Sequence, residues 1–205
     1  MSLYSRHVFP RLMDTVMSIP QLAPVRAAVL SGVSGDVFEI GVGTGLNSPH
    51  YPARVKRLTT ADPNVGMRKL ARRRFEAAGI EVTHLTVSGE CLPIDDGSFD
   101  CVVCTWTLCS IPDVEGALRE IHRILRPGGT LRFVEHGIAD NERTRRWQHR
   151  LTPVQKIISD GCHLNRDIRT LILSHHFRFE TIENYYLRGV PKFMGYLYQG
   201  VACRE

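Results

Sequence analysis

The sequence has no apolar run that approaches the roughly 18 residues needed to span a bilayer. Its first residues, MSLYSRHVFP, lack the apolar block of a secretory signal peptide. Internal repeats and low-complexity tracts are also missing. Hydrophobic and charged residues, at 43% and 23%, have ordinary globular values, which argues against a fibre, a coiled coil or a disordered chain. We therefore expect a soluble cytoplasmic protein that folds by itself.

Cysteines are few and dispersed. Six of them in 205 residues do not form the dense pattern of a disulfide-stapled secreted domain, so we expect reduced thiols that mostly act as small buried hydrophobes. Cys101 and Cys104 form a CxxC pair within CVVCTW, a run typical of a buried strand, where residues three apart point to opposite faces. A shared metal ion or disulfide is not expected there. No closed zinc motif matches a second set of potential ligands, which comprises Cys162, His163, His175 and His176. No metal site is predicted.

The charge balance is slightly basic, because 26 Lys and Arg against 21 Asp and Glu give +5. This charge permits weak attraction to anions but does not by itself indicate a nucleic-acid partner. Arginines gather between residues 143 and 150 around Trp147, a pattern compatible with gripping phosphates or with lining the mouth of a substrate pocket. Apolar residues in the same region recur at helical spacing, which predicts a helix with one apolar face: Trp147, Leu151, Val154 and Ile158.

Short β-rich runs alternate with helical segments, the pattern of an α/β fold with a mainly parallel sheet. The predicted strands are residues 36–40, 57–61, 81–86, 100–105, 131–134, 177–182 and 196–202. Between the fourth and fifth strands, helical spacing runs from Val114 to Leu125, with Asp113 as N-cap and Pro127–Gly129 as the stop. The helix after the second strand is expected to end at Gly79.

A glycine-rich loop follows the first predicted strand in the segment EIGVGTG, residues 39–45. Each glycine removes a Cβ where a ligand can approach the backbone. The dinucleotide fingerprint G-x-G-x-x-G needs a glycine at position 46, where Leu46 stands. A Walker A loop needs a lysine, which Gly45-Leu46-Asn47 does not supply. NAD, FAD and ATP are therefore disfavoured.

Further motifs accompany this loop. Asp62 ends the second strand, where an acid can accept both hydroxyls of a ribose; a helix cap is the structural alternative. The pattern L-P-x-x-D-x-S-F-D occupies residues 92–100, and L-R-P-G-G occupies residues 125–129. Together with E-x-G-x-G-x-G, these motifs resemble the class I S-adenosylmethionine-dependent methyltransferases over at least residues 36–135. The resemblance implies a Rossmann-like α/β fold, whose seven-stranded, mainly parallel sheet has an antiparallel last strand and helices on both faces.

A closer resemblance extends further along the chain. The segments CTWTLCS at 104–110, Glu135-His136, and DGCHLNR at 160–166 are similar to the methyltransferase-like 7 group, whose members are thiol S-methyltransferases. With them the resemblance runs from about Ile40 to near the C-terminus. The animal members carry an N-terminal hydrophobic membrane anchor, which this sequence does not show, so membrane location is not expected to carry over.

The resemblance implies S-adenosyl-L-methionine as cofactor and S-adenosyl-L-homocysteine as product. The methionine end of the cofactor is expected at Glu39, Gly41, Gly43 and Gly45. Asp62, followed by Pro63 and Asn64, is expected to hold the ribose hydroxyls. The adenine is expected near Gly89, Glu90 and Cys91. Thr105 and Leu108 are expected beside the methionine moiety and the transferring methyl group.

The first thirty residues and residues 137–173 do not fit the alternating pattern and are expected to be additions to the core. We expect one domain over residues 1–205, with residues 36–135 as the cofactor-binding core. Residues 1–35 would form a helical lid or substrate cap whose apolar face also suits peripheral contact with a membrane. Residues 136–205 would supply a substrate-side insertion and the final strands, since ligands bind beyond the carboxyl ends of strands in open α/β sheets.

Methyl transfer from a sulfonium depends largely on the alignment of donor and acceptor, and a thiol acceptor must first lose its proton. His136 and His163 are the candidate bases, and Asp160 is a candidate for orienting one of them. A structural hydrogen bond is the alternative role for each. The favoured function is therefore methylation of a small exogenous thiol.

Other functions remain open. The same core hosts methylation of oxygen, nitrogen or carbon in a lipid, a quinone or another metabolite. A nucleic-acid methyltransferase rests only on the net charge and the arginine cluster. A catalytically silent subunit that binds the cofactor is a further alternative.

Overall fold

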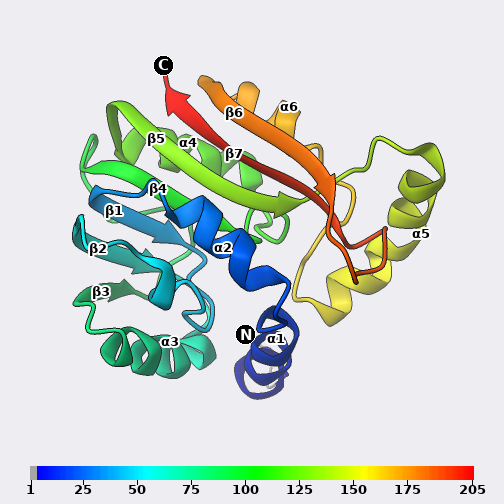
Figure 1. Ribbon diagram of the computed structural model, residues 1–205, viewed down its shortest axis with the longest axis horizontal. Helices are drawn as coiled ribbons and strands as arrows, with labels where there is room; N and C mark the ends of the chain where they lie inside the picture. The colour runs from blue at the N-terminus through cyan, green and yellow to red at the C-terminus, as the bar shows by residue number, and fades with distance from the viewer. Residues whose placement is uncertain (1–3) are drawn as a thin grey trace.

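The structure of the protein is a computed structural model, which describes residues 4–205. Seven strands form one sheet in the order β3-β2-β1-β4-β5-β7-β6 (Figure 1). Their bounds are β1 Gly35–Ile40, β2 Val55–Ala61, β3 Val82–Leu85, β4 Phe99–Thr105, β5 Leu125–His136, β6 Phe177–Tyr186 and β7 Tyr196–Arg204. Pairs among β1 to β5 are parallel, whereas β7 runs antiparallel to both β5 and β6. The predicted fold class is confirmed.

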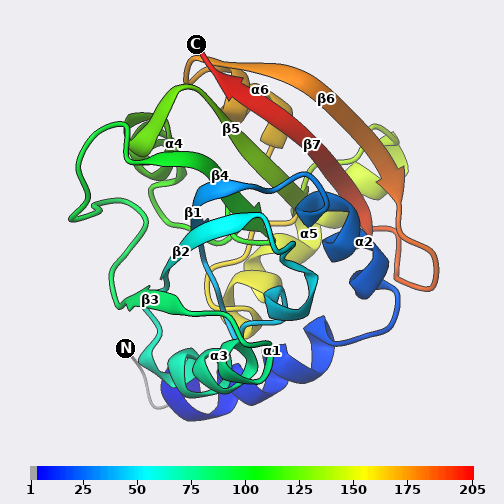
Figure 2. The same ribbon diagram turned by 60° about the vertical axis from the view of Figure 1, so that its left-hand side comes forward.

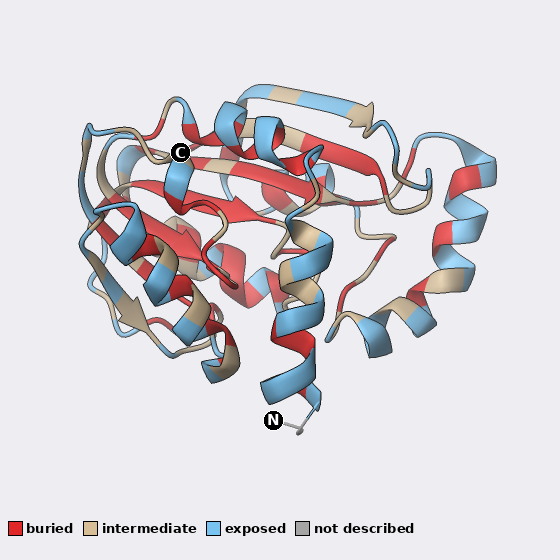
Figure 3. Cartoon of the chain, turned by 60° about the horizontal axis from the view of Figure 1, so that its bottom comes forward, coloured by how far each residue is buried: buried red, intermediate tan, exposed pale blue. Residues whose placement is uncertain are grey.

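Helices cover both faces of this sheet (Figures 1 and 2). Their bounds are α1 Phe9–Met17, α2 Leu22–Leu30, α3 Val65–Ala77, α4 Val114–Ile124, α5 Glu142–Ile158 and α6 Ile168–Leu173, with a π-helical turn at Tyr4–Val8 and a 3-10 turn at Ser48–His50. One face of the sheet packs on α4 and α6 through Val102, Leu118 and Ile168. The opposite face packs on α2 and α3 through Leu30 and Phe75. Figure 3 shows the central strands buried and the outer surfaces of the helices exposed.

The helix α4 follows from local sequence signals. The Asp113 carboxylate caps it by accepting from the Gly116 amide at 2.8 Å. The helix ends at Ile124, earlier than the predicted stop at Pro127–Gly129, which lies inside β5. The reason is pairing, because Leu125 is already extended and stands opposite Phe99 of β4.

The predicted opposite orientation of Cys101 and Cys104 is confirmed. Cys101 packs in the core beneath α3, whereas Cys104 packs in the core beneath α4, so the two side chains point to opposite faces of the sheet. All six cysteines are free, and all but Cys91 are buried.

The helix α5 differs from the sequence-based expectation. Its expected apolar face is largely in solvent, with Trp147 49% and Val154 53% exposed. The buried side chains are polar: Thr144, Gln148 and Thr152. Gln148 explains this orientation, because its amide bonds the Ala139 N–H at 2.8 Å and the Gly137 carbonyl at 2.9 Å. Within residues 4–205, no helix is both long and apolar enough to cross a membrane.

Candidate functional site

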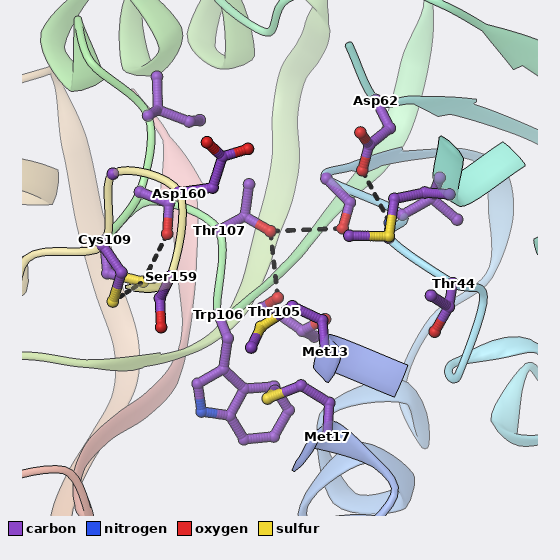
Figure 4. A pocket seen from close by; sticks show the side chains of 18 of the residues that line it. Met13, Met17, Thr44, Asp62, Thr105, Trp106, Thr107, Cys109, Ser159 and Asp160 are labelled. Carbon is purple, nitrogen blue, oxygen red and sulfur yellow. Dashed lines mark hydrogen bonds between the residues drawn. The ribbon is translucent and has the colours of Figure 1, made fainter. Parts of the chain in front are cut away.

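A cavity of about 540 Å³ lies at the carboxyl ends of the parallel strands. Its walls include Gly41 after β1, Asp62 after β2, Thr105 at the end of β4 and His136 at the end of β5. Side chains of α1 and the segment from Gln155 to Cys162 complete the wall. In Figure 4, Asp62 and Thr44 lie at one end of the view, Cys109 and Asp160 lie at the other, and Thr105 and Thr107 lie between them.

The three glycines of the glycine-rich loop meet two different structural requirements. Gly41, Gly43 and Gly45 all have positive φ, of 71°, 53° and 81°. A Cβ on Gly41 would collide with the Thr107 side chain, and one on Gly45 would lie 2.7 Å from the Ala71 Cα. A Cβ on Gly43 would meet no protein atom nearer than 4.0 Å, and Gly43 lines the cavity. The middle glycine therefore leaves space for a ligand, while the outer two allow close packing.

Glu39 supports this loop from behind. The carboxylate is 1% exposed and accepts from Asn47 Nδ2 and from the Tyr51 hydroxyl, each at 2.7 Å. Arg26 in turn donates to Asn47 Oδ1 at 2.8 Å. Burial raises the pKa of Glu39 to about 7. Glu39 is not part of the cavity wall, so the expected direct contact with a ligand is replaced by a supporting position.

Asp62 lies in the cavity wall and is tied to the loop. Its Oδ2 accepts from the Gly43 amide at 2.9 Å, and its Oδ1 accepts from the Asn64 amide at 2.8 Å. Burial raises the pKa of this carboxyl group. A carboxylate has about four lone-pair positions, so two remain for hydroxyl donors of a ligand. Asn64 caps α3 by accepting from Gly66, and it lines the cavity together with Pro63.

The expected adenine end is only partly built from the expected residues. Gly89 lines the cavity, as does Ser88. Glu90 turns away, because its carboxylate accepts from the Asp113 amide at 2.7 Å and from the Ser88 hydroxyl at 2.9 Å. Cys91 is exposed and does not contribute to the wall. Glu90 therefore fixes the turn before α4.

The segment after β4 divides its side chains between cavity and core. Thr105 lines the cavity as expected, and its hydroxyl accepts from Asn47 Nδ2 at 3.0 Å. Leu108 differs from the expectation, because it is fully buried in the core on the α4 side of the sheet. Its amide is held by Glu135 Oε1 at 3.0 Å, which fixes the side chain's direction.

Glu135, for which the sequence predicts no role, holds the loop after β4. This buried carboxylate accepts from the backbone amides of Thr107 at 2.7 Å, Leu108 at 3.0 Å and Cys109 at 3.3 Å. Burial raises the pKa of Glu135 to about 8. The sequence signal was an acid directly before His136, at the end of an apolar strand. The carboxylate positions the loop that carries Cys109.

Three reactive side chains meet at the end of the cavity opposite Asp62. His136 Nε2 lies 3.0 Å from Cys162 Sγ, and Cys162 Sγ lies 3.8 Å from Cys109 Sγ. A hydrogen bond from Cys162, opposed by burial and helped by the charge of His136, holds the pKa of Cys109 well below its usual range. Burial alone would lower the pKa of His136, but the charge of Cys109 and hydrogen bonding raise it. The group can therefore hold a thiolate beside an imidazolium.

The other two predicted catalytic side chains occupy different positions. Asp160 lines the cavity, but it accepts a hydrogen bond from the Ser5 hydroxyl at 2.7 Å rather than from a histidine. His163 lies outside the cavity wall, with its Nδ1 3.3 Å from the Cys109 carbonyl oxygen. Their proposed roles in catalysis stay predictions. The sequence does not predict that Cys109 and Cys162 are neighbours in space, because 53 residues separate them.

The remaining wall is strongly apolar. Met13 and Met17 of α1 face Trp106 (Figure 4). Leu187 and Met194 line the cavity as well. Trp106 has a φ of 50°, an unusual backbone conformation for a bulky residue. The Arg26 guanidinium lies 4.7 Å from the centre of its ring. The cavity can thus take a ligand that is polar at the Asp62 end and apolar beside Trp106.

Comparison with known proteins agrees with this geometry. Residues 38–133 match the family model of a methyltransferase domain. The thiol S-methyltransferase TMT1B of Rattus norvegicus is 39% identical over 144 residues, which cover 67% of this chain and 59% of that protein. The ubiquinone/menaquinone biosynthesis C-methyltransferase UbiE of Enterobacter sp. (strain 638) is 33% identical over 104 residues, covering 48% of this chain and 41% of that protein. The chain thus spans less than two thirds of the length of these curated relatives.

A solved structure shares the fold over nearly the whole chain. The SAM-dependent methyltransferase of Thermotoga maritima, described as a possible histamine N-methyltransferase, superposes with a TM-score of 0.69 at 23% identity and covers 98% of both chains. The conserved architecture includes the sheet whose strand ends form the cavity. Residues 38–133 are therefore a methyltransferase domain, on a fold that the chain shares with an S-adenosylmethionine-dependent methyltransferase.

Proposed function

We propose that this protein transfers the methyl group of S-adenosylmethionine to the sulfur of a small apolar thiol. The observation that carries the proposal is the placement of His136 in the cavity wall, where its Nε2 lies 3.0 Å from Cys162 Sγ. The identity to thiol S-methyltransferases over 67% of the chain supports the same acceptor class.

The residues present suit the cofactor. Asp62 has free lone pairs for the ribose hydroxyls, and Gly43 leaves its side-chain space empty. Ser88 and Gly89 would border the adenine, and Thr105 would border the methionine end. When bound, the cofactor supplies a methyl group on a positively charged sulfur.

The chain's own part in the reaction is to align the acceptor and to remove its proton. The apolar wall beside Trp106 would hold the body of the thiol, so that its sulfur faces the methyl group in line. His136 in its neutral form, with the Cys109 thiol protonated, would take the proton from the acceptor sulfur, because the thiolate is the nucleophile. Positive charge disappears as the methyl group moves, and an apolar cavity favours that change.

Carbon methylation of a quinol is the second candidate. The similarity to a ubiquinone/menaquinone C-methyltransferase favours it, and the apolar wall would suit a ring. The further alternatives predicted from the sequence stay open. They are methylation of an oxygen or a nitrogen atom, methylation of a nucleic acid, and a catalytically silent role that binds only the cofactor.

The test is transfer of label from S-adenosylmethionine to single acceptors: an alkyl thiol, hydrogen sulfide, a phenol, an amine, a quinol and RNA. We expect label in the alkyl thioether at a rate well above that of every other acceptor. Turnover with the quinol, phenol, amine or RNA in preference to both thiols would overturn the proposed acceptor. Cofactor binding without any turnover would favour a silent role.

A further inference from the structure

Cys109 and Cys162 form a pair of thiols inside the cavity. Cys109 comes from the loop after β4, and Cys162 comes from the turn between α5 and α6. Their sulfur atoms are 3.8 Å apart, and both residues line the cavity. A disulfide bond is about 2.05 Å long, so the two sulfurs need to approach by a little under 2 Å. The pair is therefore close enough to exchange between dithiol and disulfide through a small local movement.

The electrostatic surroundings separate this pair from the other buried cysteines. Burial raises the pKa of Cys101 and of Cys203 to about 11, which keeps those thiols protonated and unreactive. Cys109 instead accepts a hydrogen bond from Cys162 and lies near His136, and its pKa is well below the usual range. One sulfur of the pair can thus attack as a thiolate while the other stays protonated in reserve.

Resting on the proposed function, we propose that Cys109 and Cys162 reduce a disulfide form of the acceptor inside the cavity and release the acceptor sulfur where methyl transfer takes place. The Cys109 thiolate attacks one sulfur of the disulfide RS–SR. A bond forms between Cys109 Sγ and that sulfur, the S–S bond of the substrate breaks, and the other half leaves as RS⁻ with the electron pair.

The second thiol completes the exchange. His136 first passes the proton of the Cys109–His136 ion pair to water. Cys162 then gives its own proton to His136 and attacks Cys109 Sγ. The Cys109–Cys162 disulfide forms and the second RS⁻ leaves, so two electrons have moved from the protein to the substrate. Two molecules of a monothiol of the glutathione class would then restore the dithiol and become one symmetrical disulfide.

This chemistry would place the acceptor as a thiolate at the reaction site. A thiol that enters from solvent has to lose its proton first, whereas a sulfur released by exchange is already deprotonated. His136 lies 3.0 Å from Cys162 Sγ and would assist both reactions.

The experiment starts with reduced protein from which all reductant has been removed. Di-n-propyl disulfide and methyl-labelled S-adenosylmethionine are added together. We expect a burst of up to two labelled thioethers per protein, after which turnover stops. Mass spectrometry should find the Cys109 and Cys162 peptides joined and the protein lighter by two hydrogen atoms.

Single variants separate the two sulfurs. Cys162→Ser, which keeps a hydroxyl donor, should stop at a propyl adduct on Cys109 and release one thiol per protein. If the serine variant does not fold, Cys162→Ala should form the same adduct more slowly, because it also removes the hydrogen bond to Cys109. The matched control is Cys203→Ser, a buried cysteine in β7 outside the cavity, which should give the full burst.

Three results would contradict the inference. The first is methylation of free propanethiol at a normal rate with no burst and no joined peptides from the disulfide; the proposed function would then stand alone. The second is an adduct confined to the exposed Cys91. The third is a metal ion held by Cys109, His136 and Cys162 that blocks the exchange until it is chelated, since their ligand atoms lie within 4.8 Å of one another. Exchange without methylation of any free thiol would instead overturn the proposed acceptor and leave the dithiol chemistry in place.

Discussion

Two buried carboxylates, Glu39 and Glu135, lie beneath the loops that form the cavity. Each uses its oxygens to hold other groups of the chain rather than to face a ligand. A carboxylate in this position is sensitive to its own protonation, because burial disfavours the charged form. Glu39 offers the cleaner test, since it is remote from the thiol pair.

Glu39 should make the unfolding free energy depend on pH. Its pKa is about 7 in the folded protein and near 4.5 when exposed, because burial raises it. Between these values the folded state keeps the proton and the unfolded state loses it, so the unfolding free energy falls as pH rises from about 4.5 to about 7. The loss is on the order of 3 kcal/mol. Denaturant unfolding of wild type and Glu39→Gln at pH 5 and 7.5, without cofactor, measures it.

The glutamine variant should lack this component of the pH slope. Other titrating groups are common to both proteins and cancel in the difference between them. Equal slopes in the two proteins would mean that Glu39 does not carry the effect.

His136 should matter most where the acceptor is protonated. We expect His136→Ala to lower the rate of thiol methylation about a hundredfold at pH 7 and to approach wild type well above the acceptor's own pKa, because a thiolate needs no base. Initial rates over a pH series check this. His163→Ala is the comparison variant, because its side chain lies outside the cavity wall: a small loss would leave His136 as the base, and a loss as large as that of His136→Ala would support the base role predicted for His163. Equal loss at every pH would assign His136 to positioning alone.

The positions of some site residues could be predicted from the sequence, and those of others could not. The glycine loop and Asp62 could be placed at the cavity because their motif specifies both the residue types and the spacing between them. Glu90 and Leu108 could not, because the direction of each is set by a partner elsewhere, the Asp113 amide and Glu135. The approach of Cys109 to Cys162 depends on how the loop after β4 meets the segment after α5. No local sequence pattern predicts that contact.

At the scale of elements, the strand–loop–helix unit around Gly43 is the proposed binding site of the cofactor. We predict that Gly43→Val abolishes binding of S-adenosylmethionine, because the new side chain would occupy cavity space. Gly79→Val is the matched control. Gly79 has a φ of 68° and open surroundings, but it lies at the end of α3 away from the cavity.

Both variants should lose a similar stability, roughly 1–2 kcal/mol, from the left-handed backbone. Titration calorimetry with S-adenosylmethionine should then find binding only in the Gly79 variant and in wild type. Unchanged affinity for S-adenosylmethionine in a folded Gly43→Val protein would contradict the assignment of this loop to cofactor binding.

Elements also show where periodicity misleads. Strands β1 to β7 were recognisable because alternation and apolar runs report burial in a sheet. The helix α5 was placed correctly in sequence, but its orientation was not, since a polar side chain decided it. Gln148 bonds the backbone of Gly137 and Ala139, and those bonds outweigh the apolar stripe that includes Trp147.

At the scale of the whole molecule, the cavity lies between the sheet and the segments added to it. Residues 4–30 supply part of the apolar wall, which supports their proposed role as a substrate cap; residues 1–3 of that predicted cap lie outside the described part of the chain. We expect Met17→Gln to raise the KM for an apolar thiol about tenfold, because apolar contact is lost. The Kd for S-adenosylmethionine should stay within about twofold.

Leu12→Gln is the control for that change. Leu12 lies on the same helix, is 37% exposed and is not part of the cavity wall, so its KM should match wild type. Equal effects of the two substitutions on KM would show that the rise in KM comes from a change in α1 as a whole and not from the loss of apolar contact in the cavity. Weaker cofactor binding in Met17→Gln alone would assign this wall to the cofactor.

The central claim is that sulfur is the acceptor, and a direct competition tests it. Wild-type protein is given methyl-labelled S-adenosylmethionine together with an apolar alkyl thiol and a quinol at equal concentration, and the labelled products are identified by mass spectrometry. The placement of His136 predicts label in the thioether. Label on a ring carbon of the quinol, with the thiol untouched, would contradict it.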